Sequence, residues 1–285
     1  MSKLKLAIQK NGRLSEKSLA LLDQCGIRLS NGDRKLKTVS SNFPIEILFL
    51  RDDDIPQYVE QGVADIGILG ENEVVEKSRK VQCVKKLGFA NCRLSLAIPK
   101  DENYLGLSFF KGRKIATSYP KILEDFLSNK GISAEIEPIG GSVEIAPAIG
   151  LADGIFDIVS TGSTLQINGL KEVETVMNSE AVLISNANLS NEKQQILQQL
   201  LFRIQSVQNA AANKYILLNA PNSSLDAISN LLPGMKSPTI LPLAEAGWSS
   251  MHSVVREDDF WDIVAKLKAL GAEGILITNI EKMVL

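Results

Sequence analysis

The sequence predicts an α/β protein with a larger core followed by a smaller C-terminal domain. Two features of the pattern lead to this fold class. Short apolar strand-like runs alternate with amphipathic helical runs through most of the chain, which is typical of parallel sheets covered by helices. Near residue 213 the expected order changes to βαββαβ. The length of 285 residues is enough for two or three domains.

The composition indicates an ordinary soluble protein. Hydrophobic residues make up 45% and charged residues 22% of the chain. The net charge of −2 argues against a polyanionic partner such as nucleic acid. The first ten residues contain too short an apolar run for a signal peptide, and no run approaches a transmembrane span. We therefore expect a cytoplasmic protein.

The cysteines and the single histidine do not indicate a metal site. Cys25, Cys83 and Cys92 are odd in number and show no C-x-x-C spacing, so reduced thiols are expected. His252 cannot form a metal site alone and is more often a surface or packing residue than a catalyst.

The first strand and helix flank a turn that could meet a ligand. Residues 4–9 form an apolar strand, and leucines at helical spacing predict a helix over 14–25, with Ser15 as cap and Gly26 at its end. The turn before that helix contains Gly12 and Arg13. Arg13 could hold a phosphate or diphosphate there, or it could be a solvated arginine.

The next segments predict the rest of the first sheet. Residues 43–50 form a strand that ends in an acidic run, which we interpret as a solvated turn with Asp54 capping a short helix. Residues 64–72 contain a short strand flanked by glycines. Beyond it, strands are expected at 85–90 and 93–99. The family resemblance described below implies that the core has two lobes and that the chain crosses into the second lobe here.

The second lobe opens with a strand at 112–117 and a helix at 121–129. Tyr119 lies at the turn between them, where its ring could stack on adenine or pack in the core. A strand is expected at 134–139 and a helix at 143–149.

The segment after residue 152 contains the most informative loop. A turn with Asp153 leads into an apolar strand, 155–159, which carries Asp157, and Ser160–Thr164 follows before a helix that starts near Leu165. Backbone N–H groups and hydroxyls in such a loop suit one phosphate, whereas the missing lysine excludes a P-loop. The two aspartates could accept hydrogen bonds from ribose hydroxyls. The alternative is an ordinary connection with capping residues.

The chain then returns to the first lobe and ends in a third domain. Residues 173–185 are expected to form strands and 190–213 a long amphipathic helix. The boundaries that follow are 1–91 and 178–212 for the discontinuous first lobe, 92–177 for the second and 213–285 for the C-terminal domain. The last domain is expected to form a ferredoxin-like unit. Its strands are expected at 214–220, 239–244, 248–256 and 274–280, and its helices at 225–232 and 258–270.

The segment GSVEIAPAIGLADGIFDIVSTGSTL resembles the signature of the ATP phosphoribosyltransferase family. The matching residues are Glu144, Gly150, Asp157-Ile158 and Thr161–Leu165. Further segments are similar to this family: one begins at Ile8, one runs from Arg51 to Gly70 and one runs from Ser237 to Leu243. The segment from Arg51 to Gly70 also resembles type II periplasmic binding proteins. The resemblance covers nearly the whole chain.

This resemblance implies the long form of the enzyme. It implies a two-lobed core like that of type II periplasmic binding proteins, a reaction joining ATP through adenine N1 to phosphoribosyl pyrophosphate, and Mg²⁺ as cofactor. It also implies that the C-terminal domain binds histidine as a feedback inhibitor of the enzyme. AMP is a further possible ligand. Dimers that assemble into hexamers are expected.

The resemblance also assigns residues to three sites. The phosphoribosyl pyrophosphate site is expected to contain Asp153, Asp157, Ser160, Thr161, Gly162, Ser163 and Thr164. The ATP or AMP site is expected to contain Gly12, Arg13, Asp65, Tyr119 and Glu144. The histidine site is expected to contain Asn219 and Thr239. Mg²⁺ is expected to bind mainly through the substrate pyrophosphate.

One position departs from the family pattern, and two other functions remain open. Asn219 stands where some relatives have an aspartate that could pair with the histidine ammonium, so the strength of inhibition is open. A two-lobed sensor without catalytic activity is an alternative, although the phosphate loop argues against a simple amino-acid binder. A phosphoribosyltransferase for another base would keep the loop but would not explain the C-terminal domain.

Overall fold

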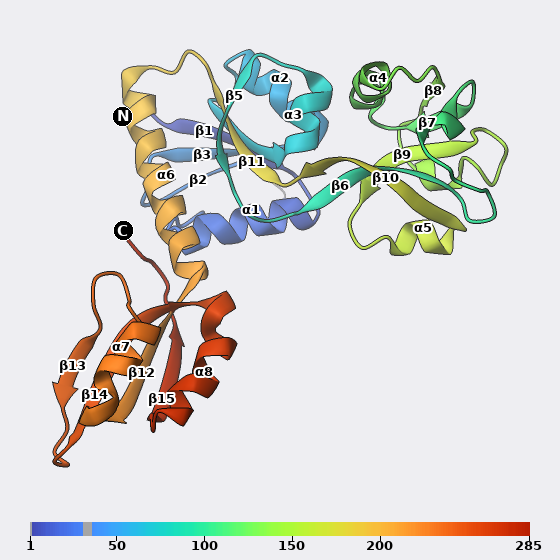
Figure 1. Cartoon of the computed structure of the whole chain (residues 1–285). Helices are drawn as coiled ribbons and strands as arrows, with labels where there is room; N and C mark the ends of the chain where they lie inside the picture. The colour runs from blue at the N-terminus through green and yellow to red at the C-terminus, as the bar shows by residue number, and fades with distance from the viewer. Residues whose placement is uncertain (1, 31–35) are drawn as a thin grey trace. The chain divides into compact units, whose positions relative to one another are not determined.

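The computed structural model describes residues 2–30 and 36–285 (Figure 1). It contains two compact units, Met1–Leu197 and Gln198–Leu285, which we call the core unit and the C-terminal unit. Within the described residues, no helix is both long and apolar enough to cross a membrane.

The core unit begins with a six-stranded sheet in the order β2-β3-β1-β4-β11-β5. Its strands are β1 (Leu4–Gln9), β2 (Lys37–Val39), β3 (Ile45–Leu50), β4 (Ile66–Gly70), β5 (Val81–Lys86) and β11 (Ala181–Asn186). The helices are α1 (Arg13–Gln24), α2 (Ile55–Glu60), α3 (Glu71–Lys77) and the start of α6 (Asn191–Ala211). Helices α1 and α2 lie on opposite faces of this sheet (Figure 1).

A five-stranded sheet in the order β10-β6-β9-β7-β8 forms the second lobe. Its strands are β6 (Cys92–Pro99), β7 (Lys114–Thr117), β8 (Glu135–Pro138), β9 (Gly154–Val159) and β10 (Leu170–Ser179). The helices α4 (Pro120–Asn129) and α5 (Ser163–Ile167) and the 3₁₀ turns η2 (Leu107–Phe110) and η3 (Val143–Ile145) complete the lobe.

Both sheets of the core unit repeat one topology, apart from the extra edge strand β2 of the first. Each has a parallel trio, β3-β1-β4 or β8-β7-β9, followed by an antiparallel strand that enters from the other lobe, β11 or β6. The chain therefore crosses between lobes twice, between β5 and β6 and between β10 and β11. This confirms the predicted two-lobed fold of the type II periplasmic binding proteins.

Several predicted elements differ in the structure. Strand β2 and helix α3 were not expected, and β5 starts four residues before the predicted 85–90. The helix expected at 143–149 is wrong, since only the 3₁₀ turn η3 forms there. Pro147 lacks a backbone N–H to continue a helix, which explains the early end. Asp54 precedes α2, but its side chain makes no capping hydrogen bond.

Gly67 sits where helix α2 packs directly on the central strand β4. A Cβ added at Gly67 would lie 2.5 Å from Ile55 Cγ2 and 3.2 Å from Val59 Cγ2, both on α2. Both isoleucine and valine are fully buried, so neither can move away freely. The segment Ala64-Asp65-Ile66-Gly67 thus contains a packing glycine beside Asp65, the residue that the resemblance assigns to the nucleotide site.

We expect Gly67→Ala to destabilise the protein by about 2 kcal/mol, because overpacking displaces α2. Urea unfolding measures this loss as a lower midpoint. Gly140→Ala is the matched control, since Gly140 is exposed and a Cβ there meets no atom within 4 Å. Equal midpoints for the two variants would contradict the packing role of Gly67.

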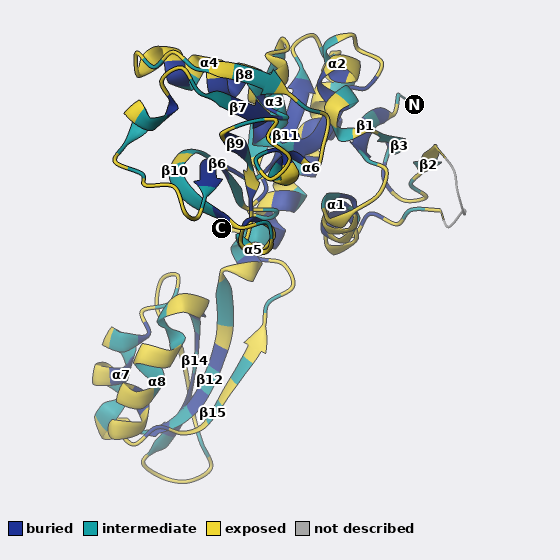
Figure 2. Cartoon of the chain, turned by 90° about the vertical axis from the view of Figure 1, so that its right-hand side faces the viewer, coloured by how far each residue is buried: buried dark blue, intermediate teal, exposed yellow. Residues whose placement is uncertain are grey.

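The C-terminal unit contains one antiparallel sheet in the order β13-β14-β12-β15. Its elements are β12 (Asn213–Pro221), η4 (Asn222–Ser224), α7 (Leu225–Leu231), β13 (Thr239–Pro242), β14 (Trp248–Arg256), η5 (Glu257–Asp259), α8 (Phe260–Ala269) and β15 (Glu273–Asn279). The order confirms the predicted βαββαβ unit. Helices α7 and α8 cover one face of the sheet with their outer sides exposed (Figure 2). The buried core under them includes Ile216, Leu218 and Ile228.

Candidate functional site

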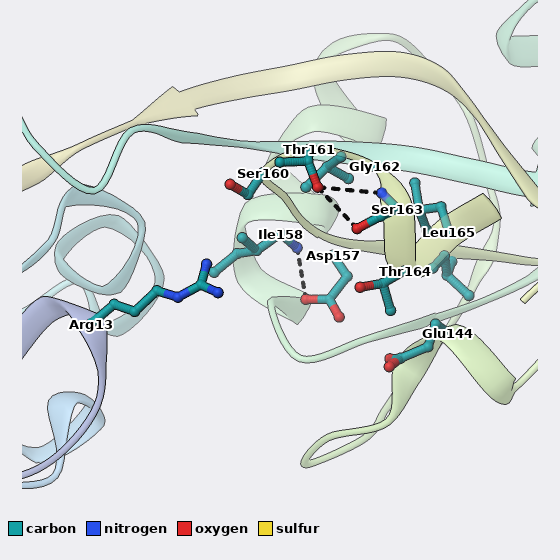
Figure 3. Close-up of a pocket in the computed structure, with 12 residues that line it drawn as sticks. Arg13, Glu144, Asp157, Ile158, Ser160, Thr161, Gly162, Ser163, Thr164 and Leu165 are labelled. Carbon is teal, nitrogen blue, oxygen red and sulfur yellow. Dashed lines mark hydrogen bonds between the residues drawn. The ribbon is translucent and has the colours of Figure 1, made fainter. Parts of the chain in front are cut away.

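A pocket of about 360 Å³ lies at the carboxyl end of strand β9. Its volume is within the range usual for small-molecule sites. The residues that line it are Arg13, Glu144, Ile155, Asp157, Ile158, Val159, Ser160, Thr161, Gly162, Ser163, Thr164 and Leu165. The strand, the loop after it and one arginine from the first lobe thus meet at one place (Figure 3).

The loop Ser160–Thr164 turns sharply at Gly162, whose φ of 81° is in the left-handed region that favours glycine. The Thr161 and Ser163 hydroxyls lie 3.0 Å apart, and Thr161 Oγ1 also accepts a hydrogen bond from the Ser163 N–H at 3.5 Å. Among the described residues, no partner is found for the backbone N–H of Thr161 or Gly162. These N–H groups and hydroxyls can therefore bind an anion.

Helix α5, which follows the loop, is shorter than the sequence suggests. It spans five residues, Ser163–Ile167, and Gly162 caps it without a side-chain hydrogen bond. A helix of little more than one turn has few aligned peptide dipoles, so it adds little positive potential to the loop. Anion binding here depends on individual N–H and hydroxyl donors.

Asp157 is the most perturbed carboxyl group of the pocket. Burial raises its pKa to about 6, and the nearby charge of Glu144 acts in the same direction. The Ile158 N–H donates to Asp157 Oδ1 at 2.8 Å and opposes part of this rise. Asp157 thus carries its negative charge at neutral pH at a cost to the folded state.

Arg13 is the only cation among the described residues that line the pocket. It is the first residue of α1, and its guanidinium points across the pocket toward Ile158 and Asp157 (Figure 3). The sequence assigned Arg13 and Glu144 to the nucleotide, and the structure places both beside the loop that was assigned to the phosphoribosyl group. The two expected sites therefore adjoin.

Asp153 does not join this pocket, which corrects the expectation that both aspartates face one ribose. It precedes β9, whereas Asp157 lies near the other end of that strand. An extended chain advances about 3.3 Å per residue, so the two carboxyl groups cannot meet. Asp153 Oδ2 instead accepts the Lys114 N–H at 2.8 Å, and the residue lines a separate hollow with Arg113 and Lys114.

Asp65 and Gly12 also lie outside the pocket lining. Asp65 is buried, and its carboxylate accepts the Lys5 N–H at 2.8 Å and pairs with the Lys193 ammonium at 2.7 Å. The Asp65 side chain therefore anchors the start of α6 to β1. Both of its carboxylate oxygens already have partners within the first lobe. Gly12 precedes α1 with a φ of 96°, a conformation that only glycine adopts easily, and so it positions Arg13.

Tyr119 is placed between the two lobes and not on an open surface. Only 8% of the residue is exposed, its ring packs in the core of the second lobe, and the Glu73 carboxylate of α3 lies near enough to affect its hydroxyl. Burial and the charge of Glu73 raise the tyrosine pKa. The ring is therefore not available to stack on adenine in this arrangement.

A second contact between the lobes was missed at the level of sequence. The Glu76 carboxylate of α3 accepts the backbone N–H groups of Lys121 and Ile122 at 3.1 and 3.0 Å. It thus caps helix α4 of the second lobe in place of a local capping residue. No local motif signals this contact, because it joins residues 45 positions apart.

Asn219 and Thr239 share one face of the C-terminal sheet. Asn219 lies opposite Ser250, and Thr239 lies opposite His252, two residues along the same strand. Residues at such positions project to the same side, here the side without helices. His252 Nδ1 lies 2.7 Å from Tyr215 Oη on this face. No group of three or more His, Cys, Asp or Glu residues suited to a metal occurs in the described part of the chain.

Two family models together match most of the chain, from residue 51 onward. Residues 51–206 match the model described as ATP phosphoribosyltransferase, and residues 210–282 match the model described as HisG, C-terminal domain. A Phocaeicola vulgatus protein named ATP phosphoribosyltransferase is 61% identical over 282 residues, which cover 99% of this chain and 100% of that protein. A protein of the same name from Bacteroides fragilis is 59% identical, with the same coverage.

A solved structure agrees with these matches. It is described as an ATP phosphoribosyl transferase (HisG:HisZ) complex from Thermotoga maritima. The matched region covers 71% of this chain and 96% of that chain, with 31% identity and a TM-score of 0.62.

Proposed function

From the membership of this chain in the ATP phosphoribosyltransferase family, in its long form, we propose its reaction and its regulation. Enzymes of this family catalyse the first step of histidine biosynthesis. ATP attacks phosphoribosyl pyrophosphate through adenine N1, forms the N-glycosidic bond and releases pyrophosphate. The observation that carries the proposal is the convergence of Arg13, Asp157 and the Ser160–Thr164 loop on one pocket.

The loop binds the 5′-phosphate of phosphoribosyl pyrophosphate. Its Thr161 and Gly162 N–H groups, for which the described part of the chain supplies no partner, and its hydroxyls give several donors to one phosphate group. The absence of a Cβ at Gly162 lets the phosphate approach the backbone. This anchoring holds the anomeric carbon at a fixed position for attack.

Asp157 lies close enough to accept a ribose hydroxyl and to favour the positive charge that develops on the ribose as pyrophosphate leaves. Its pKa of about 6 keeps it ionised at neutral pH. Arg13 neutralises the phosphates that enter from the side of the first lobe. Adenine N1 has its own lone pair, so orientation by the two lobes replaces a general base.

Mg²⁺ fits the charge balance of this pocket. Two carboxylates, Glu144 and Asp157, share the pocket with one cation, Arg13, and carboxylate oxygen is the donor that Mg²⁺ prefers. Glu144 would hold the ion together with the substrate pyrophosphate, and Asp157 would remain free for the ribose. Mg²⁺ when bound neutralises the leaving group.

Turnover of ATP and phosphoribosyl pyrophosphate with Mg²⁺ and pyrophosphatase tests the reaction. We expect formation of phosphoribosyl-ATP, followed by its ultraviolet absorbance. Binding of both substrates without product would contradict the proposed reaction and favour a sensor.

The C-terminal unit binds histidine as a feedback inhibitor on the helix-free face that carries Asn219 and Thr239. The same face exposes Tyr215, Leu241 and Leu276, whose side chains are 39%, 50% and 59% exposed. We propose that dimers assemble into hexamers through such surfaces and that the enzyme acts in the cytoplasm. AMP would compete for the nucleotide side of the core pocket.

We expect Asn219→Asp to lower the histidine concentration for half-inhibition about 10-fold, because an ionised carboxylate pairs with the ligand ammonium more strongly than an amide does. The measurement is a histidine titration of turnover. Asn230→Asp is the matched control, since it adds the same charge at an exposed position of α7. An unchanged value for Asn219→Asp, or an equal change for both variants, would place histidine elsewhere.

A further inference from the structure

Arg93 lies behind the phosphate loop and does not line its pocket. Arg93 lies on β6, where its backbone pairs with that of Val159, the last residue of the neighbouring strand β9. Arg93 Nη1 donates to the Ser160 carbonyl oxygen at 3.1 Å. The first peptide of the loop is therefore attached to a charged side chain of the neighbouring strand.

The guanidinium itself is held by a second group of side chains. Arg93 Nε and Nη2 both donate to the Glu172 carboxylate of β10, a two-point contact that limits rotation. Ser95 Oγ donates to the same carboxylate at 2.7 Å and Thr175 Oγ1 at 3.3 Å. The hydrogen bonds from Arg93 and Ser95 lower the pKa of Glu172 to about 2, so the pair is charged over the whole working range of pH.

The contact with Ser160 decides where the next N–H group points. A trans peptide is planar, with its C=O and N–H on opposite sides. Since the Ser160 carbonyl is turned toward Arg93, the Thr161 N–H of the same peptide is turned away from Arg93. Thr161 lines the pocket, and no partner for its N–H is found among the described residues.

We propose that Arg93, held by Glu172, is a positioning residue that orients the Ser160–Thr161 peptide so that its N–H binds the substrate phosphate. The inference rests on the proposed function of the loop as the site of the 5′-phosphate. It explains how a loop without lysine binds a phosphate in a defined orientation. The charge acts on the loop backbone and does not touch the ligand.

The test uses the full chain and measures binding of ribose 5-phosphate by calorimetry together with steady-state kinetics. Ribose 5-phosphate carries the phosphate that the loop would hold and reports on the loop even without turnover. We expect Arg93→Ala to weaken its binding about 30-fold and Arg93→Lys about 10-fold, because lysine lacks the planar fork. The KM for phosphoribosyl pyrophosphate should rise in parallel, and the KM for ATP should change less than about 2-fold.

Glu172→Gln separates positioning from direct contact with the phosphate. A direct phosphate ligand would bind more tightly once its competing carboxylate is neutralised. A positioning arginine loses its anchor, so ribose 5-phosphate should bind about 5-fold more weakly. Tighter binding in Glu172→Gln would overturn the proposal.

Arg79→Ala is the matched control, since Arg79 forms a comparable partly exposed pair with Glu60 in the first lobe, at 3.3 Å. It should leave ribose 5-phosphate binding unchanged. If Arg93→Ala fails to fold, Arg93→Lys and Glu172→Gln carry the test. Normal ribose 5-phosphate binding in both folded variants would refute the positioning role. If both variants bind ribose 5-phosphate more weakly than the wild type, but the wild type shows no turnover, the positioning role stands and only the proposed reaction is refuted.

Discussion

Replacing Arg13 with alanine is expected to raise the KM for phosphoribosyl pyrophosphate about 100-fold, equivalent to about 2.7 kcal/mol of binding. Within the described lining of the pocket, Arg13 is the sole cation and shares the pocket with the carboxylates of Glu144 and Asp157. Its removal leaves an anionic substrate in a pocket of negative charge. Charge-assisted hydrogen bonds from arginine to phosphate are also the strongest contacts that the pocket offers.

Two further variants define how Arg13 acts. Arg13→Lys keeps the charge but not the fork, so about 10-fold loss is expected. Lys17→Ala is the matched control, because Lys17 is an exposed cation one turn along the same helix. If Arg13→Ala and Lys17→Ala raised KM equally, general electrostatic attraction would explain the effect, and a direct role of Arg13 would be excluded.

Asp157→Asn is expected to stabilise the ligand-free protein while it lowers kcat at least about 100-fold. The unfolded chain loses the Asp157 proton near pH 3.8, and the folded protein loses it near pH 6. The folded state binds this proton more tightly, so ionisation costs stability as pH rises between these values. The shift corresponds to about 3 kcal/mol at most. Above pH 7 the wild type carries this full cost and the asparagine variant does not.

Urea unfolding at several pH values measures this difference. Wild type and Asp157→Asn should be equally stable below about pH 3, diverge between about pH 3 and 6, and differ by a constant amount above about pH 7. The amide oxygen can still accept the Ile158 N–H, so the backbone contact is retained. A gain in stability at pH 7 with full activity would show that Asp157 is a structural residue only.

Asp125→Asn provides the control for that experiment. Asp125 lies on α4, its side chain is 59% exposed, and its pair with Lys121 is a surface pair. Such pairs contribute little, so its stability should stay within about 0.5 kcal/mol of the wild type at every pH. A pH-dependent gain equal to that of Asp157→Asn would show that net charge, and not burial, is responsible.

Local signals in the sequence were enough for the α/β class, for the C-terminal domain and for the loop of the site, whereas the division of the core into two lobes was implied by the family resemblance. Apolar strands of period two, helical leucine spacing and glycine turns are encoded within ten or so residues. For this reason β1, β9 and the βαββαβ order of the C-terminal unit agree with the structure. The strand–loop segment from Asp157 to Thr164 is also continuous in the chain, so its residues necessarily lie together.

Only the tertiary structure decided which side chains of one type enter the pocket and which residues distant in the chain become partners. Asp153 and Asp157 are equivalent by composition, but the strand between them directs one into the pocket and the other to the Lys114 backbone. Asp65 resembles a ligand residue in its motif, yet it pairs with Lys193, 128 positions away. Pairing of separate strands also creates the contact of Arg93 with Ser160. Side-chain partners across such separations depend on packing, which no local pattern encodes.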